Sequence, residues 1–208
     1  MKMVLYSYQT KEAVAKLKSE GVLRLTKEDE HFTWSGHSNQ YTGFRDAYAF
    51  MVHEMKRRLP PPKFEDTSFP IWAWNKTEGK NPPTKNLDGI HRGNVRLRIE
   101  IDEERVLLSD FDYFAYLVGG GLYFKFTKED EEYVEKHLFD PIETFYPDWQ
   151  RIFNLHRKRS DAYGCSYRKE TIQATFWELF MEDVTEFKEI PSDFPCEIMD
   201  IIEHKNGQ

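Results

Sequence analysis

The segment Val95–Ile101 most constrains the fold, because apolar and charged residues alternate along it one by one. Val, Leu, Ile and Ile take the odd-numbered positions, and Arg, Arg and Glu take the even-numbered ones. A period of two predicts a β-strand with one buried face. A chain with such a strand needs a sheet and a second layer that covers the apolar face of that sheet.

Two amphipathic helices are expected beside this strand. A predicted strand over Val4–Tyr8 leads into the first helix, which begins after Thr10 as N-cap and ends at Gly21. The second spans Phe44–Leu59, where apolar residues recur at i, i+3, i+4 and i+7 and three prolines follow.

The remaining elements mix short strands with helices. Without regular βαβ alternation, this mixture favours an α+β fold class, and the length of 208 residues fits a single domain over residues 1–208. Residues 26–43 and 75–94 are interpreted as loops. The other expected strands span 69–74, 106–109, 122–126, 171–179 and 184–190, and the other expected helices run from 127 to 138 and from 140 to about 159, with an interruption near Pro147.

The chain carries 16 Phe, 11 Tyr and 5 Trp, yet its mean hydropathy is −0.72 and its net charge is −7. Disordered chains are poor in aromatic residues, so this one is expected to fold. No apolar run is long enough to cross a membrane, and the first residues lack the apolar core of an export signal. Two cysteines are too few for a disulfide framework. We therefore expect a cytoplasmic protein that has no membrane partner.

Several motifs that could carry chemistry have simpler interpretations. Gly119–Gly121 lacks the spacing of a phosphate-binding loop, so it is interpreted as a turn. Asp110 and Asp112 lack the third acidic residue of a calcium loop, so they are interpreted as turn or cap residues. The seven histidines show no metal-binding spacing, and no metal site is predicted. The basic cluster His156–Arg159 could contact phosphates or form a solvated helix end.

One carboxylate and several indole rings stand out. Glu178 lies in the apolar segment Ile172–Phe180, where it is either exposed on the open face of a strand or partly desolvated. Desolvated carboxylates are candidate catalytic groups. Trp72, Trp74 and Trp177 could stack against a planar ring or pack in the core.

Five segments together resemble an uncharacterised bacterial family of domains of unknown function. They are YQTKEAVAKLKSEGVL, FRDAYAFMVHEMKRRL, PIWAW, VRLRIEIDEERVLLSDFD and IQATFWELFMEDV. The order and spacing of these segments carry the resemblance, which implies no particular activity.

Two regions are also similar to DarT-like ADP-ribosyltransferases. VLYSYQT, followed by a helix and GVL, resembles the start of those enzymes, and IQATFWELFMEDVTEFKEI resembles their late strand with its Gln-Ala-Glu-Phe core. This resemblance implies the split-sheet ADP-ribosyltransferase fold, NAD⁺ as cosubstrate, and a nucleic-acid or protein acceptor. It also implies a role as a toxin, with a possible antitoxin as partner, or as a phage-defence effector.

The same resemblance implies roles for particular residues. Glu178 would be the catalytic carboxylate, Ser7 and Gln9 would make polar contacts to the cofactor, and Trp72 or Trp177 would stack on it.

Two positions depart from the pattern of those enzymes. Ser7 stands where they have a histidine, and Thr175 stands where their glutamate follows Gln-Ala. Strand alternation places Glu178 on the opposite face from Thr175 unless a bulge rotates it. The alternative hypothesis is therefore a non-catalytic module that binds nucleic acid or protein in the same pocket, and a regulatory or substrate-binding protein is a third. The deciding observation is whether strands 4–8 and 172–179 line one concave pocket.

Overall fold

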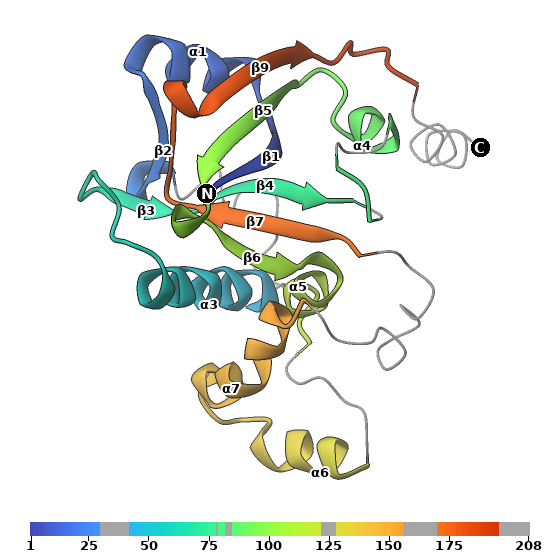
Figure 1. The fold of residues 1–208 in the computed structure, drawn as a ribbon. Coiled ribbons are helices and arrows are strands. Elements are labelled where there is room, and N and C mark those ends of the chain that lie inside the picture. Colours follow the sequence, from blue (N-terminus) through green and yellow to red (C-terminus); the bar gives the residue numbers. More distant parts are fainter. Residues whose placement is uncertain (30–41, 78, 82–84, 122–127, 156–169, 196–208) are drawn as a thin grey trace.

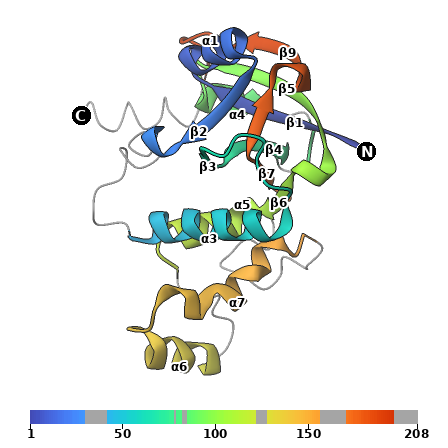
Figure 2. The ribbon, with the colours of Figure 1, turned by 90° about the vertical axis from the view of Figure 1, so that its left-hand side faces the viewer.

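The structure is a computed structural model, and its described part comprises residues 1–29, 42–77, 79–81, 85–121, 128–155 and 170–195. Two antiparallel sheets form the centre, with helices on both sides (Figures 1 and 2). This arrangement confirms the α+β class. The predicted strand over 122–126, the basic cluster His156–Arg159 and both cysteines lie outside the described residues.

The strands are β1 (Lys2–Gln9), β2 (Val22–Thr26), β3 (Thr67–Phe69), β4 (Ile71–Lys76), β5 (Val95–Asp102), β6 (Leu107–Asp110), β7 (Ile172–Phe176), β8 (Glu178–Phe180) and β9 (Val184–Glu189). The α-helices are α1 (Lys11–Glu20), α3 (Thr42–Arg58), α4 (Lys85–Ile90), α5 (Phe111–Val118), α6 (Lys128–His137) and α7 (Tyr146–Trp149). Short 3₁₀ turns are η1 (Lys27–Asp29), η2 (Glu103–Arg105), η3 (Ile142–Phe145), η4 (Gln150–Phe153) and η7 (Met181–Asp183).

The larger sheet has the strand order β6-β7-β4-β1-β5-β9, and the smaller has the order β3-β2-β8. Within the larger sheet, β1 pairs with β5 along its whole length, from Lys2 opposite Asp102 to Gln9 opposite Val95. β4 lies between β1 and β7. The two strands that carry the resemblance at the chain ends are therefore in one sheet but are not direct neighbours.

Two apolar layers cover the two faces of the larger sheet. On one face, Val14 and Leu17 of α1 pack with Leu97 and Ile99 of β5, as the alternation along that strand predicts. On the other face, α3, α5 and the helical segment 142–153 pack together in a second cluster. In Figures 1 and 2, α1 lies on the opposite side of the sheet from α3 and α5, and α6 lies farthest from the sheet.

The local signals at α1 are confirmed. The Thr10 hydroxyl accepts a hydrogen bond from the Ala13 amide at 3.2 Å. Gly21 has φ of 75°, a left-handed conformation that glycine adopts without steric strain. The second predicted helix is also present as α3, one to two residues from the expected bounds.

The prediction of one strand over 171–179 is wrong. The chain leaves the larger sheet after Phe176, bends at Trp177 and enters the smaller sheet at Glu178. The segment is buried in both sheets, and apolar residues stand on both sides of the break, so its composition does not reveal where the first strand ends.

Two short helices lie where no helix is expected. α4 falls within the predicted loop over 75–94, and α5 follows β6 directly. Asp110 is the N-cap of α5, since its carboxylate accepts hydrogen bonds from the amides of Asp112 and Tyr113. The interpretation of Asp110 as a cap residue is confirmed.

Candidate functional site

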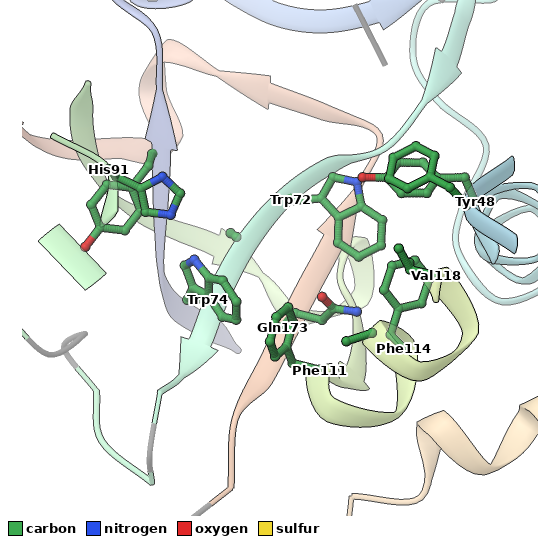
Figure 3. A pocket seen from close by; sticks show the side chains of 12 residues that line it. Tyr48, Trp72, Trp74, His91, Phe111, Phe114, Val118 and Gln173 are labelled. Carbon is green, nitrogen blue, oxygen red and sulfur yellow. The ribbon is translucent and has the colours of Figure 1, made fainter. Parts of the chain in front are cut away.

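A pocket of about 370 Å³ lies on the side of the larger sheet that faces α3 and α5 (Figure 3). Its volume falls in the range of small-molecule sites, and most of its wall is aromatic. The lining residues are Tyr8, Phe44, Tyr48, Trp72, Ala73, Trp74, His91, Phe111, Phe114, Ala115, Val118 and Gln173.

Strand alternation places the two tryptophans in this pocket. Ile71 and Ala73 of β4 belong to the apolar core with α1, so Trp72 and Trp74 project from the other face. The pairing of β4 with β7 places Trp74 directly opposite Gln173, so the indole has a polar neighbour on the next strand.

The rings gather in two groups. Around Trp72, the Phe114 ring centroid lies 4.8 Å from the indole and the Tyr48 centroid lies 5.2 Å from it. Around Trp74, the Phe111 ring meets the indole edge-on at 4.9 Å. Figure 3 shows the Gln173 amide between these groups. A ligand in the pocket would therefore contact mainly the faces and edges of these aromatic rings.

Three strands and α4 meet in a charged cluster at one end of the pocket, called the Asp88 cluster below. The Asp88 carboxylate, 2% exposed, accepts hydrogen bonds from the Tyr8 hydroxyl at 2.5 Å, from Arg96 at 2.8 Å and from Lys188 at 3.0 Å. Burial by itself would raise the pKa of Asp88, but the hydrogen bonds and the two cations outweigh it and hold the pKa below its ordinary value. This cluster holds Tyr8 in place at the pocket wall.

His91 completes that end of the pocket. Its imidazole stacks on the Tyr8 ring with the centroids 4.2 Å apart and the planes 17° from parallel. Burial lowers the pKa of His91 below its ordinary value of 6.5, and the Asp88 charge offsets this only in part. The imidazole is therefore neutral at neutral pH.

Three side chains of the aromatic wall carry a polar group, namely Trp72, Tyr48 and Gln173. The indole N–H of Trp72 has no hydrogen-bond partner in the described part of the chain. The Gln173 side chain donates a hydrogen bond from Nε2 to Ser109 Oγ at 3.0 Å. Burial also raises the pKa of Tyr48 to about 12, so its phenol stays protonated. Of these groups, the Gln173 amide and the Tyr48 phenol are polar members of an otherwise apolar wall, whereas the Trp72 N–H is buried.

Ser7 and Gln9 do not line this pocket. The Ser7 hydroxyl donates to the Trp72 carbonyl oxygen at 2.7 Å, and Gln9 Nε2 donates to Ser7 Oγ at 2.8 Å. Both residues share the face of β1 that carries core residue Leu5, whereas Tyr8 faces the pocket. The Ser7 bond joins β1 to β4, and the Gln9 bond stays within β1.

Glu178 lies at a separate cavity of about 350 Å³, which Trp177 also lines. Its carboxylate, 5% exposed, accepts hydrogen bonds from the amides of Lys63 and Phe64 at 2.9 Å and 2.7 Å and from the Thr67 hydroxyl at 3.1 Å. These bonds attach the segment after the three prolines to β8. Of the five residues that the resemblance singles out, only Trp72 lines the aromatic pocket.

Thr175 also lies away from any open surface. Its side chain is fully buried, and its hydroxyl donates to the Leu107 carbonyl oxygen at 3.3 Å and contacts the Met51 sulfur at 3.6 Å. A longer acidic side chain at this position would meet α3 rather than the pocket.

Sequence reasoning missed Tyr8, His91, Phe111, Phe114 and Gln173. Tyr8 and Gln173 could have been found from strand alternation, because each stands next to a residue that faces the apolar core. Phe111 and Phe114 come from α5 and His91 comes from the turn after α4, and the sequence shows no clear helical period in either helix.

Within the described ranges, no group of three or more His, Cys, Asp or Glu side chains is arranged to hold a metal ion. In the same ranges no helix is both long and apolar enough to cross a membrane.

Comparison with known proteins identifies the family. The model of the domain of unknown function DUF3841 matches residues 4–185, a range that contains every residue lining the pocket and ends within β9. The chain belongs to the DUF3841 family. No curated protein and no solved structure matches it significantly. The expected membership of a family of domains of unknown function is therefore confirmed.

Proposed function

We propose that the aromatic pocket binds the planar ring of a nucleotide and that NAD⁺ is its ligand. The observation that carries this proposal is the convergence of the Trp72 and Trp74 ring groups on one cavity of about 370 Å³. Stacking of a base on an aromatic side chain contributes about 1–3 kcal/mol and accepts any flat ring.

The charge of the lining supports NAD⁺ in particular. The nicotinamide ring of NAD⁺ carries a positive charge, and indole and phenol faces attract cations. No carboxylate stands among the lining residues in the described part of the chain, so ring faces are the main partner for that charge. The similarity of the two end segments to DarT-like ADP-ribosyltransferases supports the same ligand.

The activity proposed for this site is ADP-ribosyl transfer to a nucleic-acid or protein acceptor. In that reaction the bond from ribose C1′ to the nicotinamide nitrogen breaks, and nicotinamide leaves with the electron pair. The acceptor bonds to C1′ and gives its proton to a base. The resemblance assigns a carboxylate role to Glu178. A role as a toxin or phage-defence effector belongs to the same proposal.

A non-catalytic binding module is the second candidate. The specific observation in its favour is that Glu178 lies at a different cavity from Trp72 and is held there by three hydrogen bonds. In this case the aromatic pocket would stack a base of a single-stranded nucleic acid or a side chain of a protein partner.

Titration of the purified protein with NAD⁺, followed by calorimetry and by tryptophan fluorescence, tests the binding proposal. Trp74→Ala should weaken NAD⁺ binding about tenfold, because it removes one ring face. Phe139→Ala is the matched control, since that ring is 95% exposed and lies after α6, far from the pocket. Absence of NAD⁺ binding to the unmodified protein would remove the proposal.

Incubation with labelled NAD⁺ and cell extract separates the two candidates. Label transfer or nicotinamide release that is lost in Glu178→Gln, with the fold retained by circular dichroism, supports the enzyme. NAD⁺ binding without either product supports the binding module. If the protein binds single-stranded nucleic acid in a salt-dependent way, and Trp74→Ala weakens that binding, the partner of the binding module is a nucleic acid.

A further inference from the structure

Among the described residues that line the aromatic pocket, Gln173 is the one with an amide side chain. It projects from β7 next to Trp74 on one side and Ser109 of β6 on the other. The residue is 4% exposed, so its amide is removed from bulk water. A buried amide is costly unless its donor and its acceptor both have partners.

In the structure, Ser109 holds the Nε2 end of the amide. Its hydroxyl, itself fully buried, accepts the hydrogen bond from Gln173 Nε2 at 3.0 Å. No described residue donates to the carbonyl oxygen Oε1 of Gln173. In Figure 3 the amide lies in the middle of the pocket, between the rings around Trp72 and those around Trp74. A ring held by these side chains would therefore meet an acceptor oxygen at its edge.

We propose that Gln173 determines ligand specificity, with Oε1 accepting a hydrogen bond from an exocyclic NH₂ group of the bound ring. This inference rests on the proposed function, since it requires a nucleotide ring in the pocket. NAD⁺ offers two such groups, the carboxamide of nicotinamide and the amino group of adenine. An analogue that presents an oxygen at that position would bring two acceptors together and leave Gln173 unpaired.

Three dinucleotides distinguish the two rings. NAD⁺ is compared by calorimetry with nicotinic acid adenine dinucleotide, which replaces the carboxamide NH₂ by a carboxylate oxygen. It is also compared with nicotinamide hypoxanthine dinucleotide, which replaces the adenine amino group by an oxygen. We expect one of the two analogues to bind about tenfold to a hundredfold more weakly than NAD⁺, which identifies the ring that contacts Gln173.

Variants at position 173 assign the selectivity to the amide. Gln173→Leu keeps a similar volume without an acceptor, so the affinity difference between NAD⁺ and the rejected analogue should disappear. Gln173→Glu keeps an acceptor that Ser109 can hold by donating its hydroxyl proton, so the preference for NAD⁺ should persist. Ser109→Ala frees the amide to turn and should reduce the preference while Gln173 is present.

The outcomes separate this inference from the proposed function. If all three dinucleotides bind equally well, or if the selectivity survives in Gln173→Leu, the assignment to Gln173 is overturned while NAD⁺ binding stands. Preference for an analogue over NAD⁺ would show that Nε2 rather than Oε1 faces the ring, and also overturns it. If none of the three binds, the NAD⁺ proposal itself falls and the inference falls with it.

Discussion

The imidazole of His91 lies against the phenol ring of Tyr8, with the two ring centroids 4.2 Å apart. The two residues are 83 positions apart in sequence and meet because α4 places His91 over the end of β1. The Tyr8 hydroxyl is held in turn by Asp88, so the stack is tied to the Asp88 cluster. This contact links the aromatic wall of the pocket to a pH-sensitive group.

The first prediction concerns pH. Burial lowers the pKa of His91 in the folded protein from its ordinary value of 6.5, against the smaller opposing effect of Asp88. Near and below that ordinary value the unfolded chain binds more protons than the folded one, so stability falls as pH falls toward the lowered folded pKa. His91→Phe retains a ring on Tyr8 and removes the titration.

Thermal unfolding of both proteins from about pH 8 to about pH 5 measures this effect. The stability of His91→Phe relative to the unmodified protein should increase as the pH is lowered. A difference that stays constant across this range would contradict the coupling of His91 protonation to the fold.

The second prediction concerns Glu178 as a structural acceptor. Glu178→Ala removes three hydrogen bonds and leaves the amides of Lys63 and Phe64 without their partner, so we expect a loss of about 2–4 kcal/mol in the free energy of unfolding. Urea denaturation measures it. The control Glu182→Ala removes an exposed carboxylate at the same cavity and should change stability by less than about 0.5 kcal/mol.

Equal stability of the two variants would show that the hydrogen bonds of Glu178 contribute nothing net. In that case the Glu178 carboxylate would not be needed for folding. A loss of ADP-ribosyl transfer in Glu178→Gln would then indicate a catalytic role for this residue.

The third prediction concerns the close approach of α3 to the end of α5. A Cβ atom at Gly43 would lie 2.4 Å from the Gly120 Cα and 2.9 Å from the Leu117 carbonyl oxygen, so backbone would have to move. Gly43→Ala should therefore destabilise the fold by about 1–3 kcal/mol. It should also weaken ligand binding, because Phe44 and Val118 line the pocket next to this contact.

Gly119→Ala is the matched control, since a Cβ atom there would lie 3.4 Å from its nearest neighbour, the Tyr116 carbonyl oxygen. Thermal melts and NAD⁺ titrations of the two variants give the comparison. If Gly43→Ala melts at the same temperature as Gly119→Ala, the backbone contact is not a constraint on the fold.

Much of the fold could be predicted because its signals are local. The alternation in Val95–Ile101, the cap at Thr10 and the spacing of apolar residues in α3 each depend on neighbours within a few residues. The break at Trp177 has no local signal, because buried apolar residues stand on both sides of it, Phe176 before it and Leu179 after it.

The candidate site was less accessible to such reasoning. The sequence indicates Trp72 as a ring that could stack, but it does not show that Tyr8 faces the pocket while Ser7 and Gln9 project from the opposite face of the same strand. Faces are assigned by packing against the rest of the chain, and a shift of one residue reverses them.

The amino-acid sequence alone therefore determines the strands and main helices of this protein, because propensity, capping and periodicity act over short distances. It also determines the family and the number of aromatic rings. The tertiary structure decides which rings share a cavity. Pairing of β4 with β7 brings Trp74 beside Gln173, and α4 carries His91 to Tyr8. It also places Glu178 at a different cavity from those rings. Such contacts join distant segments through strand register and helix packing, which no short stretch of sequence specifies.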